Sequence, residues 1–220
     1  MIKLHPTQYQ LEAFAQGILP PAEALIVSAH CDMCQECQSI VSNHNELLAQ
    51  EAFGSTAELG EEYNDILANI IHLPQAKPTV VKPQIKSIEL DGKSFELPRA
   101  LQRYATKTGN WSKLVGKLWQ APVDLGDMGV ANFIYMEKGG SVPEHTHRGT
   151  EHTLVINGEF SDGLNDYDTG DLIFMDGQNV HAPQSHADEG CLVFTIVDQP
   201  LHFTSGLARL LNPFSHLFFR

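Results

Sequence analysis

Three side chains that bind soft metal ions lie close together near the start of the chain: His30, Cys34 and Cys37. Their positions, i, i+4 and i+7, share one face of a helix or of a helix followed by a turn. Two thiolates and an imidazole suit a tetrahedral zinc ion, which needs one further ligand. His5 is the natural fourth ligand, and its binding would fasten the N-terminal segment to the helices.

Other interpretations of these cysteines stay open. A CxxC can arise by chance, or its thiols can be buried as small apolar groups. The histidine at position 30 and the spare His5 favour a metal site instead. A redox-active CxxC is disfavoured because no strand–helix unit precedes it. Cys31 lies three residues before Cys34, where it could compete as a ligand or form a disulfide on oxidation.

A second set of candidate ligands lies far along the chain. His145, His147 and Glu151 share the same parity, so a continuous strand would point all three to one face. A later strand would supply His181 to the same interior. Three imidazoles and one carboxylate form a site of intermediate softness, which suits zinc, iron, manganese, nickel or copper.

The composition restricts the kind of protein that carries these sites. Of the 220 residues, 42% are hydrophobic, which is too many for a disordered chain. No apolar run approaches the roughly 20 residues of a membrane-spanning helix, and residues 1–6 contain no apolar signal sequence, so we expect a cytoplasmic protein. The net charge of −13 argues against direct binding to nucleic acid. Residues 1–75 contain one base and ten acids, a charge of 1 − 10 = −9, so the acidity is concentrated there.

The first expected domain is residues 1–73, in which apolar side chains recur with the spacing of four helices. The first helix is expected to begin after an N-cap at Thr7, and the second at Pro21. Pro74 ends the last helix. The proline-spaced polar stretch 74–84 is expected to be a linker.

Beyond the linker, short β-prone segments alternate with turns rich in Gly, Asp and Asn, a pattern typical of an antiparallel sandwich or barrel over residues 85–200. We expect the apolar tail, 201–220, to pack on this barrel or on a second subunit, which would give a homodimer through the barrel or the tail. The expected strands are Ile85–Leu90, Trp111–Leu118, Val130–Met136, His152–Ile156, Leu172–Met175 and Leu192–Val197.

The N-terminal motif resembles the zinc-binding anti-sigma domain. The resemblance is carried by Leu11–Pro20 (LEAFAQGILP) and Val27–Cys37 (VSAHCDMCQEC), and His5 lies where that family has a further histidine. It implies a four-helix module that wraps a group IV (extracytoplasmic-function) sigma factor and blocks its access to core RNA polymerase. The acidic surface agrees, because charge complementary to a basic sigma factor would speed encounter. The zinc ligands implied are His5, His30, Cys34 and Cys37.

The second motif is similar to the cupin signature, with Gly139, His145, His147, Glu151 and Gly158 at the characteristic spacing and His181 further on. The first half of the signature matches in full. In the second half, Asp176-Gly177-Gln178 stands where cupins have Pro-x-Gly, and Ser185 replaces the customary Asn. These changes affect the turn rather than the ligands.

The stretch from Glu151 to Cys191 is similar to the cupin-like domain of the ChrR-type anti-sigma factors in particular. The two resemblances cover residues 1–73 and roughly 100–200, in the order that this family has them. They imply a helical zinc module followed by an RmlC-like jelly-roll barrel, which holds zinc or another divalent metal such as iron, manganese or nickel.

The leading hypothesis is therefore a regulator that holds a sigma factor inactive in the cytoplasm. By resemblance, the signal for release is oxidative stress such as singlet oxygen, with the metal-bound cupin needed for the response. Oxidised thiolates lose zinc, and a zinc-dependent fold loses structure with it. A rival hypothesis is a cupin metalloenzyme of dioxygenase or isomerase type, and a third is a cupin that senses a small ligand. No catalytic residue is predicted, although Glu144 and Arg148 flank the second site.

Overall fold

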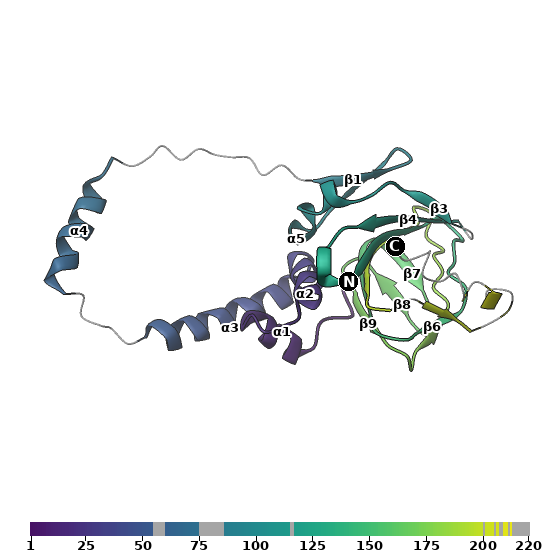
Figure 1. Ribbon diagram of the computed structural model, residues 1–220, viewed down its shortest axis with the longest axis horizontal. Helices are drawn as coiled ribbons and strands as arrows, with labels where there is room; N and C mark the ends of the chain where they lie inside the picture. Colours follow the sequence, from purple (N-terminus) through teal and green to yellow (C-terminus); the bar gives the residue numbers. More distant parts are fainter. Residues whose placement is uncertain are drawn as a thin grey trace.

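The computed structural model places a set of N-terminal helices against one side of a β-barrel (Figure 1). It describes residues 1–54, 60–74, 86–114, 117–199, 201–204, 206, 209–210 and 212. Within these residues, no helix combines the length and the apolar character that a membrane crossing requires.

The helices begin and end where local chemistry predicts. Helix α1 (Gln8–Ala15) starts with a capping box, in which the Thr7 side chain accepts from the backbone N–H of Gln10, and α2 (Pro21–Met33) starts with proline. Both predicted starts are thus confirmed. Helices α3 (Gln35–Phe53) and α4 (Glu61–His72) follow.

The barrel is built from one large antiparallel sheet and a smaller one that faces it. In the large sheet the order is β3 (Ser112–Leu114), β4 (Leu118–Val123), β5 (Val130–Met136), β11 (Cys191–Val197), β7 (Glu151–Ser161) and β8 (Asp166–Asp168), and β9 (Leu172–Met175) also pairs with β7. The small sheet has the order β10 (Val180–His181), β6 (His145–His147) and β12 (Leu201–Phe203). A hairpin of β1 (Ser87–Leu90) and β2 (Lys93–Glu96) and a short helix α5 (Arg99–Gln102) precede them.

Two of the strand predictions were wrong in detail. The segment Trp111–Leu118 is two strands, β3 and β4, because the chain reverses near Lys117, which adopts a φ of +61°. The ligands His145 and Glu151 do not share a continuous strand, since β6 ends at His147 and β7 begins at Glu151. Gly149 lies against Asp198, where a Cβ atom would meet the carboxylate oxygen at 1.8 Å, and the N–H of Thr150 donates to that oxygen (2.7 Å). The strand is interrupted beside this contact.

Other predictions fall partly outside the described residues. Of the expected linker, only Pro74 is described. The start of the expected strand at Ile85 and most of the tail also lie outside. Within the tail, β12 pairs with β6, so its first residues belong to the barrel.

The helices and the barrel share one apolar core. Leu25 and Ile26 of α2 are buried in the same cluster as Leu101 of α5 and Phe194 of β11. The carboxylate of Asp32, near the end of α2, also accepts from the backbone N–H of Ala100 in α5 (2.7 Å). Helix α2 is therefore fixed on the barrel by apolar contacts and by a hydrogen bond to the backbone.

The segment before α1, residues 1–6, is called the N-terminal arm here. It runs along the barrel beside the start of β9. The backbone N–H groups of Lys3 and Leu4 both donate to Asp171 Oδ1 (2.6 and 3.0 Å), and the N–H of Leu172 donates to the carbonyl of Leu4 (3.1 Å). The arm is thus anchored to the barrel at Lys3 and Leu4, and His5 lies between this anchor and α1.

Candidate metal centres

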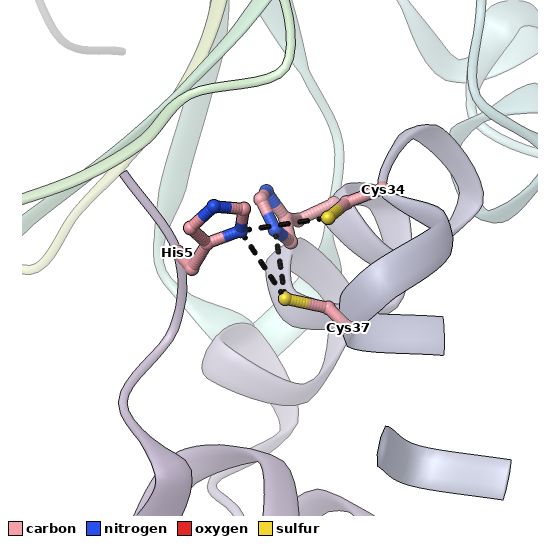
Figure 2. Close-up of side chains that lie close together, drawn as sticks. His5, Cys34 and Cys37 are labelled. Carbon is pink, nitrogen blue, oxygen red and sulfur yellow. Dashed lines mark hydrogen bonds between the residues drawn. The ribbon is translucent and has the colours of Figure 1, made fainter. Parts of the chain in front are cut away.

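The first predicted ligand set comes together in the structure. His5 Nδ1 lies 3.4 Å from the Sγ atoms of both Cys34 and Cys37, and His30 Nε2 lies 3.3 Å from Cys37 Sγ. Figure 2 shows the His5 ring facing the two thiols, with the arm on one side and the helices on the other. The four ligand atoms all lie within 4.8 Å of one another.

A break between two helices brings the cysteines to the histidine. Cys34 ends α2 and begins α3, with extended backbone angles (φ −113°, ψ 104°) in place of helical ones. His30 thus projects from the last turn of α2, and Cys37 from the first turn of α3. Of the two arrangements that the spacing allows, the structure has the helix followed by a turn.

The barrel contributes a hydrogen bond that orients His30. The Nδ1–H of this ring donates to the carbonyl oxygen of Gly170, in the turn before β9, at 2.8 Å. Because Nδ1 is the donor, Nε2 keeps its lone pair, and Nε2 is the atom that faces Cys37. Such a contact to a backbone carbonyl is how proteins usually fix the tautomer of a metal-binding histidine.

The residues of this first site fit a divalent cation. Burial lowers the pKa of His30 to about 4, so the ring is a neutral ligand at pH 7. Burial, together with the neighbouring Cys34, raises the pKa of Cys37 to about 12, and a bound cation supplies the counter-charge that favours the thiolate. A tetrahedral zinc ion with ordinary bond lengths holds nitrogen and sulfur ligands about 3.5 Å apart, close to the spacing observed here.

The second predicted set also comes together, in the space between the two sheets. His181 Nε2 lies 2.9 Å from His145 Nε2 and 3.0 Å from His147 Nε2, and His147 Nε2 lies 3.2 Å from Glu151 Oε2. Three imidazole nitrogens that face one another at this distance have too few protons to bond mutually, and a cation in their midst gives all three lone pairs a partner. The donor set is that of a transition-metal site, and no single metal is specified by it.

Burial prepares this second set for a cation. It lowers the pKa of both His145 and His147 to about 4, helped by the nearby His181 ring. The Nδ1–H of His145 donates to the carbonyl of Pro143 (2.8 Å), which leaves Nε2 free to bind. The Thr153 hydroxyl donates to Glu151 Oε1 (2.6 Å) and orients the carboxylate.

Asp162 lies near the other ring nitrogen of His181, with 3.8 Å between Asp162 Oδ2 and His181 Nδ1. Burial works against its ionisation. Hydrogen bonds from the N–H groups of Asn165 and Leu164 and from the Tyr167 hydroxyl nevertheless lower the pKa of Asp162. The lowered pKa favours the charged carboxylate, which lies near the imidazole, although His181 Nδ1 makes no hydrogen bond to a described residue.

The remaining candidates lie outside both ligand sets. Cys31 is buried next to the first site, and burial raises its pKa to about 11, but its sulfur is not among the clustered atoms. Cys191 is fully buried in β11, which raises the pKa of its thiol, so it is an apolar residue of the barrel core. His152 is not part of the second ligand set, and its Nε2 lies 3.2 Å from the Glu23 carboxylate of α2.

The supporting residues Gly170 and Asp171 were not predicted as parts of the first site. They belong to the stretch from Glu151 to Cys191 that resembles a cupin-like domain, and the sequence analysis assigned them no role of their own. Their role depends on packing between parts of the chain about 140 residues apart, and no local pattern reports such a contact.

Comparison with known proteins relates both parts of the chain to one family. Residues 100–200 match the family model described as the ChrR cupin-like domain. The anti-sigma-E factor ChrR of Cereibacter sphaeroides is 29% identical over 221 residues, which cover 97% of this chain and 98% of the relative. The chain is thus similar to this anti-sigma factor along nearly its whole length. The name of this relative describes a regulator rather than an enzyme.

One solved structure supports the fold along most of the chain. The crystal structure of Rhodobacter sphaeroides SigE in complex with the anti-sigma ChrR contains a chain that matches with a TM-score of 0.64 at 23% identity, covering 90% of this chain and 100% of that one. An RmlC-like cupin from Ralstonia eutropha matches over 46% of this chain and 69% of its own, at 17% identity and a TM-score of 0.40. The first match shows the predicted order, a helical part followed by a cupin-like barrel.

Proposed function

We propose that this protein is an anti-sigma factor that binds a group IV sigma factor and keeps it from core RNA polymerase. The observation that carries the proposal is helix α4, which stands away from the other helices and the barrel (Figure 1) and presents an apolar face without a cover among the described residues. The relationship to ChrR, whose name and complex with SigE identify it as an anti-sigma factor, supplies the class of partner.

The apolar face of α4 has the length and pattern of a docking helix. Its side chains recur at helical spacing and are between 50% and 68% exposed. In a complex, this apolar face would lie in a hydrophobic groove of the partner and would be removed from water. The residues are Tyr63, Ile66, Leu67, Ile70 and Ile71.

The charge and the metal sites complete the proposal. The charge of −9 over residues 1–75 favours a basic partner such as a sigma factor. Zinc at His5, His30, Cys34 and Cys37 would hold α2, α3 and the arm in the binding-competent arrangement. The barrel, with zinc or another divalent metal at His145, His147, Glu151 and His181, would be needed for release. We place the protein in the cytoplasm, where sigma factors act.

For release, we propose an oxidant such as singlet oxygen. Thiolate ligands are readily oxidised, and their oxidation removes donors from the metal. Loss of the metal would then release the arm from the helices, and a sigma factor held by those helices would be freed.

The direct test of the proposal uses the face of α4. The full chain is used to capture partners from cells of its own source, and the captured sigma factor is then titrated in purified form. Ile66→Asp combined with Ile70→Asp places two charges on the apolar face, and Ala68→Asp combined with Asn69→Asp places two on the opposite face. Because each buried isoleucine contributes about 2 kcal/mol, we expect the first pair to weaken binding at least 100-fold and the second to change it little.

Two outcomes would contradict the proposal. One is that no sigma factor is captured, with or without a zinc chelator. The other is equal affinity of the two double variants, since the apolar face would then not be the contact. If the zinc chelator by itself abolishes capture, we would conclude that the sigma factor binds only when the first metal site is filled.

A further inference from the structure

Asp162, in the turn between β7 and β8, holds a fully buried carboxylate next to the second ligand set. Its Oδ1 accepts from the backbone N–H groups of Leu164 and Asn165, both at 2.8 Å, and its Oδ2 accepts from the Tyr167 hydroxyl at 2.7 Å. A carboxylate offers about four lone pairs, so one at Oδ2 has no partner among the described residues. Oδ2 is also the atom that lies 3.8 Å from His181 Nδ1.

The His181 ring has the complementary need. For Nε2 to bind a metal ion through its lone pair, the proton of the neutral ring must be on Nδ1. In His145, the equivalent N–H donates to the carbonyl of Pro143 (2.8 Å). In His181, the buried Nδ1 has no hydrogen-bond partner in the described part of the chain. A buried N–H without an acceptor costs free energy, and native proteins seldom keep one.

Backbone hydrogen bonds hold the two residues on neighbouring segments. The N–H of Gln184 donates to the carbonyl of Ser161 at 2.7 Å, and the N–H of Ser161 donates to the carbonyl of Gln184 at 2.9 Å. The N–H of Ala182, which directly follows His181, donates to the carbonyl of Asp162 at 3.4 Å. The two segments are thus fastened to each other, and only a small movement of the imidazole ring is needed to close the remaining gap.

We infer that Asp162 is a positioning residue for the second metal site, whose Oδ2 accepts the Nδ1–H of His181 when a divalent ion is bound at Nε2. The hydrogen bond keeps the ring in the tautomer that binds metal and makes Nε2 a stronger donor to the ion, as carboxylates behind metal-binding histidines do in proteins. The inference rests on the second metal site of the proposed function and does not depend on the binding of a sigma factor.

The spacing of the ligand nitrogens supports this role. His181 Nε2 lies 2.9 Å from His145 Nε2 and 3.0 Å from His147 Nε2. Nitrogen ligands of a tetrahedral zinc ion at ordinary bond lengths lie about 3.3 Å apart. A bound ion therefore moves the His181 ring away from the other two. Because Nδ1 is on the part of the ring that faces Asp162, this movement shortens the gap to the carboxylate.

The test compares Asp162→Asn with the native full chain. Asparagine keeps an oxygen for the N–H groups of Leu164 and Asn165, so the turn is retained, and it places an amide nitrogen where Oδ2 was. This nitrogen is a donor, whereas His181 needs an acceptor, so the variant favours the tautomer that cannot bind metal through Nε2. We expect zinc affinity at the second site, measured by competition with a chelator, to fall about 10- to 100-fold, while the first site in the same molecule keeps its affinity.

Asp124→Asn is the matched control. Asp124 accepts from the N–H of Gly126 (2.9 Å) in an exposed turn after β4, so this variant makes the same chemical change and the same change in net charge. Zinc affinity at both sites should stay within about twofold of the native value.

A spectroscopic measurement separates positioning from a general loss of stability. In the zinc-loaded native chain with isotope-labelled histidine, we expect the Nδ1–H resonance of His181 to lie far downfield and to exchange slowly with water, because a buried carboxylate accepts this proton. In zinc-loaded Asp162→Asn, it should shift upfield and exchange faster. The resonances of the first-site histidines should not change.

Three results would overturn the inference. The first is native zinc affinity at the second site in Asp162→Asn, and the second is an unchanged Nδ1–H resonance of His181 in this variant. The third is an equal loss of affinity at both metal sites, which would show that Asp162 supports the fold as a whole. Absence of a second bound zinc in the native chain would differ from all three, because it would refute the metal site of the proposed function and the inference with it.

Discussion

The anchor of the N-terminal arm offers a sharp test of how the barrel supports the first metal site. Asp171 is fully buried, and its carboxylate accepts three backbone N–H groups: Lys3 and Leu4 at Oδ1, and Asp168 at Oδ2 (2.8 Å). Replacing Asp171 with alanine removes all three acceptors. His5, which directly follows the two anchored residues, should then lose its fixed position.

The expected size of the effect comes from the two bonds to the arm. Hydrogen bonds to a charged acceptor are worth about 1.5–3 kcal/mol each. The arm can recover part of this by exposing its N–H groups to water. It also keeps the backbone bond from Leu172 to Leu4 and a surface ion pair between Lys3 and Asp168, which solvent screens. A net loss of about 3 kcal/mol remains. It corresponds to zinc affinity at the first site that is on the order of 100-fold weaker.

Competition with a chromophoric zinc chelator measures this affinity, and the second site in the same molecule provides an internal reference. Asp171→Asn keeps a carbonyl oxygen for the arm and should lose only about tenfold, because a neutral acceptor is weaker than a charged one. Asp168→Ala removes only the surface ion pairs with Lys3 and the N-terminal amine and should change the affinity less than about threefold. Native zinc affinity in a folded Asp171→Ala protein would refute the reasoning, since His5 would then not depend on the barrel.

Three further changes have defined outcomes. Cys34→Ser with Cys37→Ser should reduce bound zinc by one equivalent and leave the second site filled, as metal analysis of the purified protein would show; two remaining equivalents would contradict the ligand assignment. His181→Ala should remove the other equivalent while circular dichroism of the helices stays native, and a loss of both metals would show that the sites are not independent. Gly149→Ala should lower the free energy of unfolding by about 1 kcal/mol, because its Cβ would displace the exposed Asp198 carboxylate and break the hydrogen bonds to Thr150; unchanged denaturant unfolding would show that these bonds contribute nothing to stability.

The ligand sets could be predicted because their chemistry is local in sequence. His30, Cys34 and Cys37 stand on consecutive turns, and the pair His145 and His147 has the spacing of one strand face. Helix starts were predictable for the same reason, as Thr7 and Pro21 act within a single turn. Whether these residues bind metal stays a prediction that the experiments above address.

What could not be predicted depends on contacts between distant segments. The strand break before Glu151 lies beside Asp198, which follows Gly149 by 49 residues and would be an ordinary turn residue in any local pattern. The acceptor for His30 is a backbone carbonyl, and carbonyls leave no mark in a sequence. The sequence predicted α4 as one helix of a four-helix module. In the structure its apolar face is exposed, which the sequence did not indicate.

The dependence of the first site on Gly170 and Asp171 bears on how truncated chains should be interpreted. A chain cut within the predicted linker keeps all four candidate ligands, yet it loses the carbonyl that orients His30 and the carboxylate that anchors the arm. If such a fragment fails to repress, the failure can come from a weakened zinc site rather than from a missing contact with the partner. Measuring the zinc content of each fragment beside its activity would separate the two causes, and deletion of the barrel alone cannot be taken as removal of a sensor.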